Sequence, residues 1–193
     1  MGYPSDSLDL QKRANDGLIE QNQQAKEMSY QQKESEKLRS FESTFYSLAE
    51  VARKEYERFE ITKPNGATCR GSLAVTAIED KLQVDSAAAD HHLTLSRIFD
   101  SLDDESGMGI FSVVRSFYIL LRVTVDRCPP EHREQYIDIC VYSMPIKLIH
   151  LVCLAKVFTE WDNMRVLTEY GFFSRPGIEE YVNGWTLISQ QEP

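Results

Sequence analysis

A long stretch without helix breakers is the feature that most constrains this chain. No proline occurs between Pro4 and Pro64, and Gly17 is the only glycine between them. Apolar residues in the second half of this stretch recur in alternating steps of three and four, at Leu38, Phe41, Phe45, Leu48, Ala52 and, after Glu55, Phe59. A spacing near 3.5 keeps one helix face against a partner helix. We therefore expect one helix from about residue 7 to 61.

The first half of this helix is polar, rich in Gln, Glu, Lys, Asn and Ser up to about residue 37. Isolated helices gain little from propensity alone, so such a segment needs self-association or another chain to persist. We expect an oligomerisation seam formed by Leu38, Phe41, Phe45 and Leu48. The alternative is that residues 1–35 are frayed or disordered, which their composition also allows.

The remainder of the chain predicts further helices rather than strands. Pro64 and the Asn65-Gly66 turn end the long helix. Helical spacing and breakers then predict helices at 73–82, 86–102, 110–127, 131–141, 146–158, 160–170 and 178–182. Ser86 is expected to cap the second of these, and no convincing strand pattern is present. The fold class is all-α, with a stem over 1–61 and a multi-helix head over 62–193.

The helix predicted at 110–127 is expected to be central to the core. Its apolar positions recur at helical spacing, and they are Ile110, Val113, Val114, Phe117, Leu120, Leu121 and Thr124.

Charge and cysteine content limit the function classes. The net charge is 21 − 30 = −9, which argues against a coat on duplex DNA or acidic membrane, although a local basic site remains open. The four cysteines form no C-x-x-C pair, so reduced thiols and a cytoplasmic setting are expected. No secretion signal is visible, and charged residues interrupt the apolar stretches 110–125 and 146–158, so no membrane span is predicted.

The best binding candidate is a helix face carrying Arg115, Tyr118 and Arg122, which offsets of three and seven place together. Two guanidinium groups can hold a phosphate or carboxylate. Alternatively, they pair with acids of neighbouring helices or extend to the surface. Adjacent His91 and His92 diverge on a helix, which is poor chelating geometry. We expect no metal, no cofactor and no catalytic set, because none of the usual motifs occurs.

Arg127 and His132 have the Arg-x4-His spacing found in RNA-cleaving toxins of the helical HEPN superfamily. Pro129 and Pro130 lie between them and prevent the continuous helix that would project both side chains into one site. The spacing is also short enough to arise by chance. We therefore expect that these two residues are not catalytic.

One segment is more distinctive. Residues 31–48, and above all Phe41-Glu42-Ser43-Thr44-Phe45-Tyr46-Ser47-Leu48, resemble the Phe-Glu-x-Thr-Phe-Phe-x-Leu-Leu block of the putative phage abortive infection (AbiC-like) family. Further matches are Arg115-x-x-Tyr118-x-x-Leu121, Tyr136-Ile137 and Leu167-x-Glu169-Tyr170-x-Phe172. Family members usually carry a membrane hairpin before the stem, which is not seen here, and an Arg-Ala-Gln-Leu-Ser block, replaced here by residues 140–145.

The resemblance implies a bacterial anti-phage defence protein that oligomerises or senses a trigger. Its expected partners are a second copy of the chain, another defence-system protein or a phage-derived trigger, and nucleic acid is possible but not indicated. Two other function classes stay open: an RNA-cleaving enzyme of the HEPN type, and a structural coiled-coil adaptor.

Overall fold

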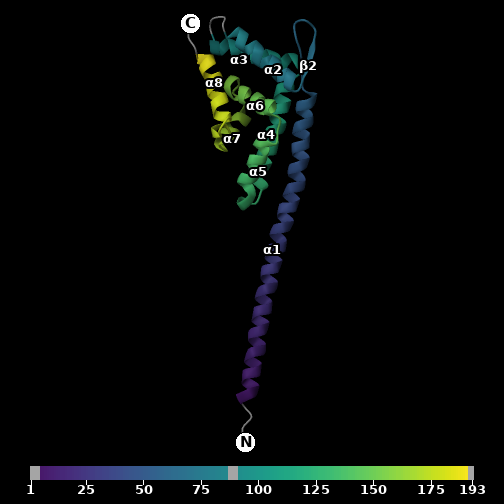
Figure 1. Ribbon diagram of the computed structural model, residues 1–193, viewed down its shortest axis with the longest axis vertical. Coiled ribbons are helices and arrows are strands. Elements are labelled where there is room, and N and C mark those ends of the chain that lie inside the picture. The colour runs from purple at the N-terminus through teal and green to yellow at the C-terminus, as the bar shows by residue number, and fades with distance from the viewer. Residues whose placement is uncertain (1–4, 87–90, 191–193) are drawn as a thin grey trace. The chain divides into compact units, whose positions relative to one another are not determined.

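The computed structural model describes residues 5–86 and 91–190. The chain divides into two compact units, residues 1–43 and 44–193. Helix α1 (Ser5–Arg58) is one uninterrupted ribbon that supplies residues to both (Figure 1). Sequence reasoning placed the boundary at 61/62 instead. The difference arises because residues 44–58 belong to the packed second unit, where Phe45, Ala52 and Tyr56 are buried.

A short hairpin follows α1, which corrects the expectation that no strand is present. Strand β1 (Glu60–Thr62) pairs antiparallel with β2 (Thr68–Arg70), and Ile61 lies opposite Cys69. The turn is the one that Asn65-Gly66 predicts: Gly66 has φ 80°, and the Ala67 N–H donates to Asn65 Oδ1 at 3.0 Å. Three-residue strands are too short to show an alternation in the sequence.

The rest of the second unit is helical, which confirms the all-α fold class. Its elements are α2 (Ser72–Asp85), α3 (His91–Glu105), α4 (Gly109–Arg127), α5 (Pro130–Tyr142), α6 (Ile146–Phe158), α7 (Asp162–Glu169), the 3-10 helix η1 (Phe172–Ser174) and α8 (Ile178–Gln190). Two expectations were wrong. Ser86 caps the C-terminus of α2 rather than the start of the next helix, and α8 continues well past residue 182.

Helix α6 lies at the centre of the second unit, in contact with α2, α3, α4 and α8. Its buried residues run almost without interruption and are Leu148, Ile149, Leu151, Val152, Cys153, Leu154, Ala155 and Phe158. Helix α4 is amphipathic by contrast, and its seven buried residues are the seven that the sequence predicted. The core therefore forms around α6, with α4 as one of the helices that cover it (Figure 1).

Aromatic contacts join distant parts of the second unit. The Phe45 ring meets the Tyr136 ring of α5 edge to face, with centroids 5.0 Å apart. The Phe117 ring of α4 lies 5.3 Å from the Phe172 ring of η1. Both Phe45 and Phe117 are fully buried, so each fills core volume that a smaller side chain would leave empty.

Phe45→Ala is therefore expected to lower the free energy of unfolding by about 3–5 kcal/mol, because it leaves a cavity beside Tyr136. Val51→Ala, on an exposed position of the same helix, is the control and should change it by less than about 0.5 kcal/mol. Urea unfolding followed by circular dichroism measures both. Equal effects of the two variants would contradict the placement of Phe45 in the core.

Candidate functional site

The structure brings Tyr118 and Arg122 into direct contact on α4. Arg122 Nη1 donates to the Tyr118 hydroxyl at 2.8 Å, and Arg122 Nε lies 3.4 Å from Asp126 Oδ2. The Tyr118 hydroxyl and the Asp126 carboxylate both raise the pKa of Arg122. Arg115 is exposed on the same helix, and about half of the Arg122 side chain is accessible. Arg122 thus has its acidic partner on its own helix.

A further residue lies at this face that sequence reasoning did not include in the site. Tyr170, at the C-terminal end of α7, has a raised pKa, first through partial burial and then through the nearby Asp126 carboxylate, while Arg122 acts in the opposite direction. Helices α4 and α7 are in contact. We call Arg115, Tyr118, Arg122 and Tyr170 the arginine face. Only the fold brings Tyr170 here, so no spacing in the sequence predicts its place at this face.

The residues of the predicted oligomerisation seam are divided between the two units. Leu38 and Phe41 belong to residues 1–43, whereas Phe45 and Leu48 belong to residues 44–193. Phe45 is 1% exposed within one chain, where it packs on Tyr136, and Leu48 is half-buried. Phe45 is therefore occupied by core packing. A role for this seam in oligomerisation stays a prediction.

The helix is interrupted between Arg127 and His132, as the two prolines predict. Arg127 is the last residue of α4, Cys128 and Pro129 have extended backbone, and α5 begins at Pro130. The side chains of His91 and His92 lie outside the described residues. Within the part of the chain that is described, no group of three or more His, Cys, Asp or Glu is placed to hold a metal ion.

A polar cluster that the sequence did not reveal joins three helices of the second unit. Glu79 of α2 accepts hydrogen bonds from Lys147 of α6 and from the Tyr181 hydroxyl of α8, the latter at 2.7 Å. His150 Nδ1 of α6 lies 2.9 Å from Glu79 Oε1, and the His150 ring stacks on the Tyr181 ring at 3.9 Å. We call these four residues the Glu79 cluster. Its members are 68 to 102 residues from Glu79 along the chain.

The electrostatics of the Glu79 cluster indicate a clamp rather than a catalytic base. Burial raises the pKa of Glu79, but hydrogen bonds from His150, Lys147 and Tyr181 outweigh it and lower the pKa to about 2. Burial and the Glu79 carboxylate raise the pKa of Tyr181. Cys153 lies one turn beyond His150, but burial raises the pKa of its thiol to about 12, so the thiolate that a nucleophile needs is not formed at neutral pH.

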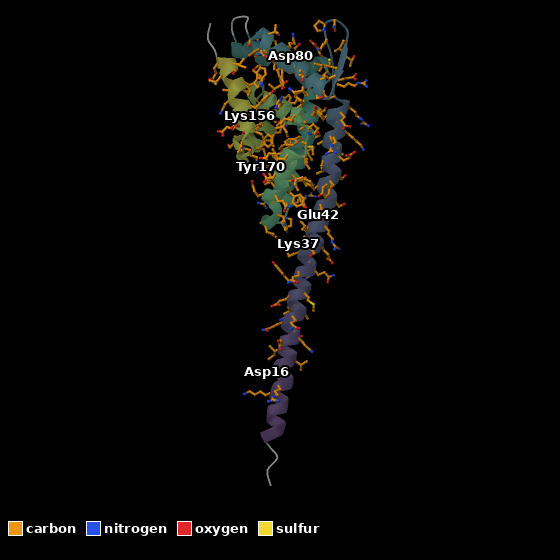
Figure 2. The ribbon with its side chains drawn as sticks, in the orientation of Figure 1. Asp16, Lys37, Glu42, Asp80, Lys156 and Tyr170 are labelled. Carbon is orange, nitrogen blue, oxygen red and sulfur yellow. The ribbon has the colours of Figure 1, made fainter. Side chains whose placement is uncertain are left out.

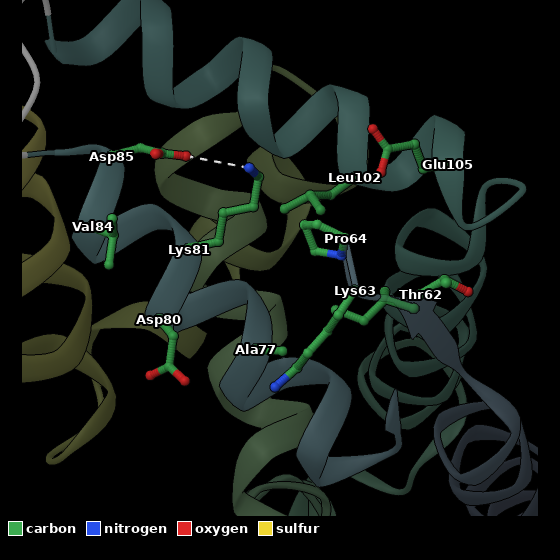
Figure 3. A pocket seen from close by; sticks show the side chains of 11 residues that line it. Thr62, Lys63, Pro64, Ala77, Asp80, Lys81, Val84, Asp85, Leu102 and Glu105 are labelled. Atoms are coloured by element: carbon green, nitrogen blue, oxygen red, sulfur yellow. Dashed lines mark ion pairs between the residues drawn. The ribbon is translucent and has the colours of Figure 1, made fainter. Parts of the chain in front are cut away.

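A surface pocket of about 500 Å³ lies between the β1–β2 turn, α2 and α3 (Figure 3). Its apolar lining residues are Ile61, Pro64, Ala77, Val84 and Leu102. Its rim carries both signs of charge, from Lys63, Asp80, Lys81, Asp85 and Glu105, with Lys81 and Asp85 paired at 3.4 Å (Figure 3). Because the rim charges are mixed, electrostatics select no class of ligand for this pocket.

Across the described residues, no single helix is both long and apolar enough to span a membrane. Two pairs of successive helices, α3 with α4 and α5 with α6, are long and apolar enough only when taken together, and they bend by 92° and 98° where they join. Comparison of the chain with known protein families, with curated proteins and with solved structures finds no match.

The lowered pKa of Glu79 predicts a pH-dependent contribution to stability. The ordinary value is 4.5, so the ionised Glu79 stabilises the fold above about pH 4.5, and this contribution is lost as the pH falls toward 2. Between about pH 5 and pH 3, the free energy of unfolding should therefore decline less steeply for Glu79→Gln than for the wild type. Asp80→Asn, at the exposed neighbouring carboxyl, is the control. Parallel curves for the wild type and Glu79→Gln in urea titrations would contradict the clamp.

Proposed function

We propose that this chain is an anti-phage defence protein of the abortive-infection type, acting in the cytoplasm as an oligomerising interaction or sensor module. The defence role is supported by the resemblance of residues 31–48 and of three later segments to the AbiC-like family. The interaction role is supported by the exposed arginine face and by the polar, exposed helix of the first unit. The partner is a second copy, another defence-system protein or a phage-derived trigger.

Contacts link the segments that carry the resemblance in two pairs. Phe45 packs on Tyr136, which joins the first segment to the third. The second and fourth segments lie on or next to α4 and α7. There the Arg122 charge opposes the rise that burial causes in the pKa of Tyr170. Residues that are shared because they form one fold are expected to contact each other in this way. These contacts support a shared scaffold, and they leave the activity to be tested.

The observation that carries the interaction role is the accessibility of Arg115 and Arg122. The alternative was that both arginines pair with acids of neighbouring helices. Arg122 contacts Tyr118 and Asp126 of its own helix instead, and no ion pair of Arg115 is present among the described residues. Two accessible guanidinium groups beside two phenols can bind a phosphate or a carboxylate of a partner.

The proposal is tested by expressing the gene with its native neighbours and measuring protection against a broad panel of phages. The intact gene should lower plaque formation, and Arg122→Gln should abolish this protection without lowering the melting temperature, because it removes the charge and keeps much of the aliphatic stem. Arg165→Gln is the matched control, since Arg165 is an exposed arginine of α7 outside the arginine face.

Two outcomes separate the parts of the proposal. If the intact gene gives no protection against any phage, the defence role is wrong. If Arg122→Gln protects as well as the wild type, the defence role stands and the arginine face is not its binding site.

His132→Ala should leave phage protection unchanged, because the interrupted helix between Arg127 and His132 does not support a ribonuclease site. Plaque counts and an RNA-cleavage assay on the purified variant measure this. Loss of both activities in a folded His132→Ala protein would favour the enzyme instead.

A further inference from the structure

The charges of α1 follow one register from residue 5 to residue 35, and Glu36, Arg39 and Glu42 depart from it. With Leu18 and Ala25 at position a of a heptad and Met28 at position d, the charged residues from 15 to 35 all occupy positions b, c and f. They are Asp16, Glu20, Lys26, Glu27, Lys33 and Glu34. The four charged residues between Ser5 and Ala14 fall in the same three positions. One face of the helix is therefore uncharged for 31 residues, or about 46 Å.

The uncharged face is made of amides, small residues and a few apolar side chains. Positions a, d, e and g hold Gln and Asn at 21, 22, 24, 31 and 32, together with Leu18, Ala25 and Met28. Leu18 is 57% exposed and Met28 64% exposed. Around Asp16 the side chains extend outward from a single helix (Figure 2). Gln32 donates a hydrogen bond to Glu36 of the same helix at 3.1 Å, and no contact within the first unit covers the other described side chains of this face.

The amide groups of this face favour one kind of binding partner. An amide both donates and accepts hydrogen bonds, so a second amide-rich face satisfies it. An apolar groove would leave the amides unpaired, and a charged surface would find no opposite charge. Polar residues at seam positions are also what fixes the register of paired helices.

Net charge does not oppose self-association through the first unit. Residues 44–193 carry 15 − 22 = −7, whereas residues 1–43 carry 6 − 8 = −2. The net charge per residue is the same in both units, so pairing through the first unit brings together a smaller total charge because that unit is shorter. Pairing through the second unit would bring together most of the chain's negative charge.

We propose that the uncharged face of α1, residues 5–35, pairs with the same face of a second copy of this chain. This pairing rests on the oligomerising part of the proposed function. Its contact residues lie within residues 5–35 and differ from the predicted seam, where Phe45 packs in the core. Sedimentation measures association, whereas plaque counts measure defence. A failure of the proposed pairing can therefore be told apart from a failure of the proposed defence role.

Sedimentation velocity of the full chain between about 1 and 100 µM tests this pairing. The wild type should form a species of twice the 22.2 kDa chain mass. Gln21→Glu places like charges across the seam at position d and should raise the dissociation constant about tenfold or more. Gln23→Glu makes the same chemical change at position f and should alter it less than about twofold.

A gain-of-function variant keeps the test independent of any loss of folding. Ala25→Leu adds apolar area at position a and should lower the dissociation constant about tenfold. A wild type that is monomeric at 100 µM would overturn the proposal. So would equal effects of Gln21→Glu and Gln23→Glu, or an Ala25→Leu variant that associates no more tightly than the wild type.

Discussion

The second unit depends on the burial of one helix. Helix α6 buries eight of its apolar residues, so it needs α2, α3, α4 and α8 around it, and Ile146 at its start is exposed. Three of its residues carry polar groups: Lys147 and His150 have polar partners in the Glu79 cluster, and Lys156 lies over the Phe173 ring. Burial of a charged amine is costly without a partner, so the cluster is a condition for placing this helix in the core.

This arrangement decides what remains for function. The buried carboxylate of Glu79 is fully hydrogen-bonded, and the buried cysteines have raised pKa values, so the interior of the second unit offers packing and little reactive chemistry. Its accessible chemistry lies on the arginine face and on the rim of the pocket in Figure 3. These accessible groups are where the proposed interaction role is open to test.

The sequence predicted the elements whose pattern is local. The seven core positions of α4 and the bounds of α6 follow from helical spacing and from Pro145, and both are as expected. The β1–β2 hairpin was missed because each strand has only three residues, and the extent of α8 was missed because polar residues and Gly184 interrupt its apolar pattern. Glu79 and Tyr170 were missed because their partners are distant in sequence and only the fold unites them.

We propose that the polar helix of the first unit is stabilised by association with a second copy, whereas the second unit packs within one chain. Amide hydrogen exchange at low and high protein concentration tests this most directly, because an isolated polar helix opens readily whereas a paired one does not. Protection of residues 12–35 should rise with protein concentration, while protection of α6 should stay constant. Protection of residues 12–35 that is independent of concentration would contradict it.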